Sequence, residues 1–211
     1  MAKRSAPEVN AGSMADIAFL LLIFFLVTTT IEVDSGLNRK LPPIEDSEPP
    51  IIKERNIFQL TVNGKNQLLL KANGNDGKII ELDDLRKEAV AFLDNGGGIG
   101  EDACKRCKGK RNPSSSDNFN KAIISLQNDR FTSYETYIAV QNEIIAAYNE
   151  LRNREFVADF PNLKMNYVEA EKMYNDPRTP PEEKERLKDK LESIKLLIPQ
   201  KFSEAEPKKS N

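Results

Sequence analysis

An unbroken apolar run headed by a carboxylate is the feature that most limits how this chain can fold. Every residue from Ile17 to Val27 is apolar, and Asp16 stands immediately before the run. Read as a helix over residues 10–31, the segment has about 22 residues and a length of about 33 Å, which matches a hydrocarbon core about 30 Å thick. The sequence therefore predicts a single membrane-spanning helix over residues 10–31.

Two other interpretations of the apolar run compete with a spanning helix. A secretory signal peptide would use Lys3 and Arg4 as its basic start and the run as its apolar core. The carboxylate at the head of the run, and the absence of an A-x-A-like cleavage site after Val27, argue against a signal peptide. A helix buried in a protein core is disfavoured because the run is apolar on every face, while the rest of the chain is polar.

Asp16 is the residue in this segment with the clearest functional meaning. An ionisable group within a spanning helix costs at least about 2.5 kcal/mol near the centre and by default marks an ion or proton path. On a helical wheel it shares a stripe with Leu20, Ile23, Val27 and Thr30, which offers no basic counter-ion. A carboxylate enclosed there can exchange a proton instead of staying charged. The alternative is an interfacial carboxylate that reaches headgroup water.

Three consecutive hydroxyl residues follow the run and are weaker candidates for a polar relay, because a hydroxyl can pass a hydrogen bond but cannot hold a charge. They are Thr28, Thr29 and Thr30. In a helix their hydroxyls can bond back to earlier carbonyls, so they are compatible with a span.

Composition excludes several classes of function for the rest of the chain. The 211 residues carry a formal net charge of -2 and are 30% charged. With a pI of about 5.5 the chain lacks the concentrated basic surface that nucleic-acid binding requires. It has no His and two Cys, which argues against zinc catalysis and Ser-His-Asp triads. We expect neither an enzyme, nor a metal site, nor a cofactor.

After the span, the sequence predicts a linker and one α+β domain. Residues 32–55 include a stretch rich in Pro, Glu and Asp, which is typical of an extended linker. The expected strands are 56–62, 67–71, 121–126 and 198–203. The expected helices are one over 83–94 capped by Asp83 or Asp84, one that begins after Thr132 or Ser133, and one that begins at Thr179. This order predicts a mixed sheet with helices on one face over residues 56–203, followed by a polar tail, 204–211.

The second of these helices has a stripe that we expect to form its core face. Its members are Tyr134, Ile138, Gln141, Ile145, Tyr148 and Leu151. No constellation of acids, bases or nucleophiles accompanies the stripe, so packing explains it better than ligand binding.

Cys104 and Cys107 form a C-x-x-C motif within a basic run, between Gly-rich and Ser-rich segments. A local disulfide in an oxidising compartment is the expected state. Two alternatives stay open. A dimer can share four thiolates around zinc, although one chain supplies too few ligands. Thioredoxin-like redox catalysis needs the motif at a helix start, whereas this one lies in a loop. The basic run is either solvated or in contact with an anionic surface.

Two motifs resemble a known membrane-protein family. Asn10–Thr28 is similar to the ExbD/TolR pattern, in which N-x-T-P-x-x-D opens an apolar helix that ends F-M-V; here Gly12 and Ser13 replace Thr-Pro. Gly36–Pro42 is similar to the V-x-L-P motif at the start of that family's periplasmic domain. The resemblance is close over residues 1–43 and looser to residue 160. It implies insertions near residues 99–119 and 161–190 relative to short family members.

The resemblance implies a function and a location. The chain would be an ExbD-like subunit of a proton-motive-force-driven inner-membrane motor, with Asp16 as its proton-translocating residue. It would form a homodimer inside a ring of ExbB-like subunits and act on a TonB-like protein that opens outer-membrane transporters. Residues 1–9 would be a cytoplasmic tail and the C-terminal domain would be periplasmic. The alternatives are a TolR-like subunit for envelope integrity, with peptidoglycan as a partner, and a plain single-pass membrane-anchored adaptor.

Overall fold

The computed structural model describes residues 11–28, 52–72 and 77–205. The chain divides into two units, Met1–Glu48 and Pro49–Asn211, which are considered separately. In the first unit, α1 runs from Ala11 to Thr28. Among the described residues, no helix has both the length and the apolar character needed to cross a membrane. The spanning helix over residues 10–31 therefore stays a prediction.

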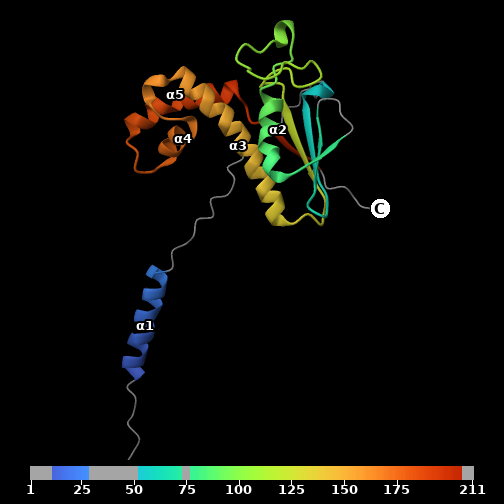
Figure 1. Ribbon diagram of the computed structural model, residues 1–211. Helices are drawn as coiled ribbons and strands as arrows, with labels where there is room; N and C mark the ends of the chain where they lie inside the picture. Colours follow the sequence, from blue (N-terminus) through green and yellow to red (C-terminus); the bar gives the residue numbers. More distant parts are fainter. Residues whose placement is uncertain (1–10, 29–51, 73–76, 206–211) are drawn as a thin grey trace, which may run out of the picture. The chain divides into compact units, whose positions relative to one another are not determined.

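The second unit contains a five-stranded sheet and four α-helices among its described residues (Figure 1). The strands are β1 (Ile57–Val62), β2 (Leu68–Lys71), β3 (Lys78–Ile80), β4 (Ile123–Asn128) and β5 (Phe202–Ala205). The helices are α2 (Leu82–Leu93), α3 (Tyr134–Asp159), α4 (Tyr167–Asn175) and α5 (Pro181–Leu197). Short 3-10 turns lie at Glu54–Asn56, Gly100–Asp102 and Pro161–Leu163.

The sheet is mixed, as the sequence predicts. Its strand order is β3-β2-β1-β4-β5. The first three strands form an antiparallel meander, whereas β1 pairs with β4, and β4 with β5, in parallel. Parallel neighbours need crossover connections. Here α2 lies between β3 and β4 in the sequence, and α3 to α5 lie between β4 and β5.

The main core lies between one face of the sheet and the helices α2 and α3, which Figure 1 shows side by side along the sheet. Alternate residues of β1 and β4 supply its sheet side: Phe58, Leu60, Val62, Ile124 and Leu126, each at most 1% exposed. The opposite face of the sheet carries more exposed side chains, including Leu69 and Ile79. This arrangement confirms the predicted α+β domain with a mixed sheet and helices.

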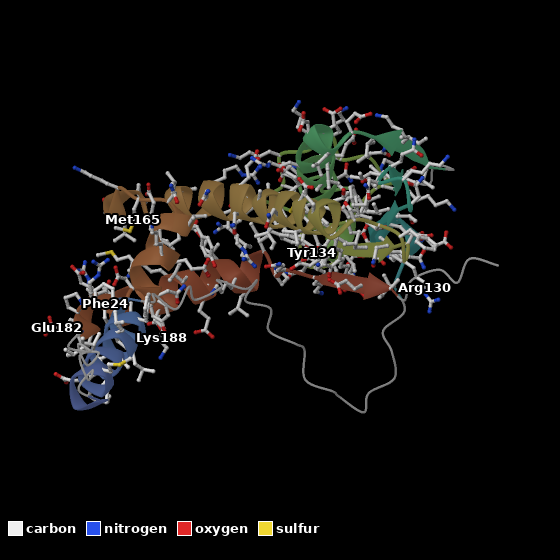
Figure 2. All side chains as sticks on the ribbon, turned by 90° about the horizontal axis from the view of Figure 1, so that it is seen from below. Phe24, Arg130, Tyr134, Met165, Glu182 and Lys188 are labelled. Atoms are coloured by element: carbon white, nitrogen blue, oxygen red, sulfur yellow. A yellow bond between two sulfur atoms is a disulfide. The ribbon has the colours of Figure 1, made fainter. Side chains whose placement is uncertain are left out.

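A second, smaller core joins the C-terminal half of α3 to α4 and α5. Phe156, Tyr167, Leu187, Leu191 and Ile194 form its centre. Figure 2 places Met165, Glu182 and Lys188 at this end of the domain and Tyr134 and Arg130 at the other. Helix α4 was not expected from the sequence, although its capping box was present: Asn166 and Glu169 cap each other's backbone N–H groups.

Several local predictions need correction. Helix α2 begins at Leu82, before both of the predicted caps, and Glu81 occupies the N-cap position without a side-chain capping bond. Asp83 and Asp84 lie instead in the first turn, where a negative charge interacts favourably with the helix dipole. In α3 the predicted cap Ser133 is confirmed, since its side chain accepts a hydrogen bond from Thr136 N.

The predicted core stripe of α3 is only partly correct. Gln141, Tyr148 and Leu151 are buried, whereas Tyr134 is 77% exposed. The buried face also includes Val140, Ile144 and Ala147. These smaller residues are spaced three and four apart, which is the spacing of one helix face. At the end of the sheet, β5 extends to Ala205, two residues past the predicted domain boundary.

Candidate functional site

The first candidate site is Asp16 in α1. It is the one ionisable residue in the sequence of the helix from Ala11 to Thr28. Its side chain is exposed, as are those of Leu20 and Ile23 on the same helical stripe. An exposed carboxylate on an apolar helix has no charged partner within that helix. A partner helix packed on this stripe would therefore enclose the carboxylate.

The structure describes only part of the candidate relay. Thr28 is the last residue of α1, and its side chain is outside the described set. Thr29 and Thr30 lie outside the described residues altogether. The role of these threonines stays a prediction.

The second candidate site is the long connection between α2 and β4, which holds the C-x-x-C motif. Cys104 and Cys107 are joined by a disulfide. Cys107 is 4% exposed and packs in the main core, whereas Cys104 is partly exposed. The backbone N–H of Cys107 donates to Cys104 Sγ at 3.1 Å. The two sulfurs thus occupy different environments.

Asp94 and Asn95, which directly follow α2, hold this connection by accepting hydrogen bonds from its backbone N–H groups. Asp94 Oδ1 accepts from Lys108 N at 3.0 Å, and Asp94 O accepts from Gly109 N at 2.9 Å. Asn95 Oδ1 accepts from Asn112 N at 2.9 Å. A Cβ at Gly97 would lie 2.2 Å from Asn112 O, so only glycine allows this close approach.

A cluster of ion pairs ties the same connection to α3. Arg154 contacts Asp94 with both terminal nitrogens, at 2.6 and 2.8 Å. Arg106 binds Asp159 at 2.8 Å and Glu155 at 3.3 Å. The hydrogen bond to Asp159 is the main reason that the pKa of Arg106 is raised, and Asp94 has the same effect on the pKa of Arg154. The two buried acids of this cluster, Asp94 and Glu155, thus each have an arginine partner.

The C-terminal end of the connection contains a fully buried acid. Asp117 Oδ1 lies 2.5 Å from Arg55 Nη2, and Lys53 Nζ lies 3.6 Å from Asp117 Oδ2. Asp102 nearby binds Lys53 and Lys121. The hydrogen bond from Lys121 is the largest cause of the lowered pKa of Asp102. Sequence reasoning missed this cluster, because its members are far apart in the chain.

Neither candidate site resembles a metal centre or a hydrolytic site. Within the described ranges, no group of three or more His, Cys, Asp and Glu residues is arranged to hold a metal ion. Three acids of the α2–β4 connection, Asp94, Asp102 and Asp117, are bound to Lys or Arg side chains. A shallow hollow beside the disulfide is lined in part by Cys104, Arg106 and Phe119.

Comparison with protein families gives one match. The model of the family described as biopolymer transport protein ExbD/TolR matches residues 2–152. The chain belongs to the ExbD/TolR family. The match covers α1, the sheet from β1 to β4, α2, and α3 as far as Arg152, and it confirms the predicted resemblance. A search of curated proteins finds no match.

The residues matched by the family model include both α1 and the disulfide of Cys104 and Cys107. The matched residues include the Asn10–Thr28 segment from which the resemblance was argued. The helices α4 and α5, and the strand β5, lie beyond the matched residues.

Proposed function

We propose that this chain is an ExbD-like subunit of a proton-driven motor in the inner membrane. One observation carries the proposal: Asp16 is the sole ionisable residue in the sequence of an otherwise apolar α1, within a chain of the ExbD/TolR family. A protonatable group within an apolar helix is by default part of an ion path. A proton that crosses the membrane releases about 2.3 kcal/mol per 100 mV, which sets the work available in each step.

In this proposal α1 is the central part of a single spanning helix over residues 10–31. Residues 1–9 are cytoplasmic, and the sheet domain is periplasmic. Two copies of the chain lie inside a ring of ExbB-like subunits, whose helices enclose Asp16. Protonation and release at Asp16 move the pair relative to the ring, and a TonB-like protein receives that motion. The chain binds the ring subunits and transmits the motion to the TonB-like protein, and it is not an enzyme.

Co-purification tests whether the chain has such a ring partner. The tagged full chain is extracted from its native membrane in mild detergent, and the proteins bound to it are identified by mass spectrometry. The proposal predicts a multi-span membrane protein in stoichiometric excess over the chain. As a matched control, a tagged version that begins at Pro49 and lacks α1 should not retain that protein.

Two other outcomes would each favour a different function. Recovery of the full chain without a multi-span partner would contradict the motor and support a single-pass adaptor. A ring partner together with a deletion phenotype of envelope fragility, without loss of energised uptake, would support a TolR-like subunit. Loss of energised uptake on deletion is the result that the ExbD-like proposal predicts.

A further inference from the structure

We propose that Cys104 and Cys107 form a reversible thiol–disulfide exchange site that accepts electrons from a dithiol on an acidic partner protein. This inference is independent of the motor, because it uses only the connection between α2 and β4. Cys104 is the sulfur that enters a mixed disulfide, and Cys107 is the sulfur that is released.

The different exposure of the two cysteines sets the direction of attack. Cys107 is 4% exposed and belongs to the main core, whereas Cys104 is partly exposed and lines the hollow beside Phe119. Access decides which sulfur of a disulfide an incoming thiolate can reach. The partner thiolate therefore attacks Cys104 Sγ.

The surroundings of Cys104 stabilise a negative charge on its sulfur. The N–H of Cys107 donates to Cys104 Sγ at 3.1 Å. Lys105 follows Cys104 directly, and Lys105 and Lys108 are exposed. Amide donors and nearby cations are the features that make a cysteine reactive. A sulfur that holds charge well is also a good leaving group.

The connection stays anchored when the disulfide is open. Asp94 holds Lys108 N and Gly109 N, and Arg106 binds Asp159 at 2.8 Å. None of these bonds involves a sulfur atom. Gly96 leaves room for Cys107, since a Cβ there would lie 2.7 Å from Cys107 Cβ. Both thiols therefore remain close to each other after reduction, which favours reoxidation.

The exchange proceeds in two balanced steps. A partner thiolate forms a bond to Cys104 Sγ, the Cys104–Cys107 bond breaks, and the electron pair goes to Cys107 Sγ, which takes a proton from water. The second partner thiolate then attacks the partner sulfur of the mixed disulfide, and the electron pair goes to Cys104 Sγ. The partner dithiol is oxidised to a disulfide, and the Cys104–Cys107 pair is reduced by two electrons.

The basic surface around the motif indicates the partner's charge. Lys105, Lys108, Lys110 and Arg111 are exposed around the disulfide. An acidic segment next to the partner's thiols would be drawn to this surface and would raise the association rate at low salt.

Two single variants of the full chain test which sulfur reacts. Cys107→Ser leaves Cys104, and Cys104→Ser leaves Cys107. Each is treated with oxidised glutathione at pH 7, and the mixed disulfide is followed by mass spectrometry. We expect Cys107→Ser to react at least about tenfold faster. Equal rates, or a faster Cys104→Ser, would overturn the proposal. Circular dichroism of both variants checks that they are folded.

Redox equilibration of the unmodified chain tests reversibility. Over a series of ratios of reduced to oxidised glutathione, the pair should pass fully between disulfide and dithiol with an unchanged circular dichroism spectrum. Structural disulfides resist reduction by the glutathione pool. A disulfide that remains intact at every ratio, or a loss of secondary structure on reduction, would overturn the proposal.

A pair of synthetic peptides tests the partner chemistry. Both contain two reduced cysteines with the same spacing, one flanked by Glu and the other by Lys. The oxidised full chain should convert the Glu peptide to its disulfide at least about tenfold faster at low salt, and added salt should narrow the difference. Equal rates for the two peptides would overturn the assignment of an acidic partner.

Discussion

The buried residues Asn56 and Asp117 bind each other through two hydrogen bonds. Asn56 Nδ2 donates to Asp117 Oδ2 at 3.0 Å, and Asp117 N donates to Asn56 Oδ1 at 2.8 Å. Asn56 directly precedes β1, and Asp117 lies in the connection that leads to β4. Because β1 and β4 are parallel neighbours, this pair fastens the start of one strand to the approach of the other.

Loss of this pair should destabilise the sheet domain. Asn56→Ala removes both bonds and leaves the Asp117 carboxylate buried with fewer donors, which should lower the free energy of unfolding by about 2 to 4 kcal/mol. Urea denaturation followed by circular dichroism measures the change. Glu88→Ala, which removes an exposed pair with Lys78, is the control and should change stability by less than about 1 kcal/mol. Equal effects of the two variants would contradict the account.

Oxidation of the motif is a second prediction. A periplasmic domain lies in an oxidising compartment, so Cys104 and Cys107 should be bonded to each other in protein purified without reductant. Alkylation followed by mass spectrometry should label neither cysteine, and labelling after denaturation and reduction should reach both. Full labelling of both cysteines before reduction would contradict the disulfide and the periplasmic location.

Acid should weaken the packing of α4 on α5. Burial alone would raise the pKa of Glu171, but hydrogen bonds from Lys195 and Tyr167 outweigh it and hold this pKa below its ordinary value of 4.5. A carboxyl group whose pKa is lowered by folding stabilises the protein at pH values above the pKa that it has in the unfolded chain. That contribution is lost as the pH falls through the pKa that the group has in the folded protein.

The test of this linkage is a comparison of two proteins at two pH values. The unfolding midpoint in urea should fall between pH 6 and pH 3 by more in the unmodified chain than in Glu171→Gln, which cannot titrate at this position. Other carboxylates contribute equally to both proteins, so the difference isolates Glu171. An identical fall in both would rule out the Lys195 pair as a source of acid sensitivity.

The sequence predicts the regular parts of the fold better than its buried polar contacts. Alternation of the side chains between two faces over residues 57–62 identifies β1, and the Ser133 cap identifies the start of α3, because both signals are local. β3 has three residues, too few to show alternation. The buried guanidinium of Arg152 is stabilised because its Nε and Nη2 donate hydrogen bonds to the backbone oxygen of Ile198. Ile198 lies in a distant part of the chain. Sequence spacing gives no signal for such a pair.

One candidate site is marked by a local sequence pattern, whereas the surroundings of the other depend on the fold. The apolar run with one carboxylate is a local pattern, so Asp16 can be proposed as a site from the sequence alone. The environment of Cys104 depends on Asp94, Arg106 and Phe119, which the fold brings together, and the sequence shows only that a C-x-x-C motif lies in a basic loop. The spacing of the two cysteines does not reveal that one is exposed and the other buried.

In the proposed motor, Asp16 must exchange a proton in each step. The most direct measurement is growth of a strain carrying Asp16→Asn on a substrate that requires energised outer-membrane uptake, with protein level and ring-partner binding checked in parallel. The substitution keeps the size of the side chain and removes its proton exchange. Asp16→Glu, which keeps the titration but moves it by one methylene, should retain partial activity, and Thr28→Val should reduce activity less than Asp16→Asn. We expect Asp16→Asn to be made, to bind its partner and to grow no better than a deletion strain; growth at the unmodified rate would contradict a proton role for Asp16.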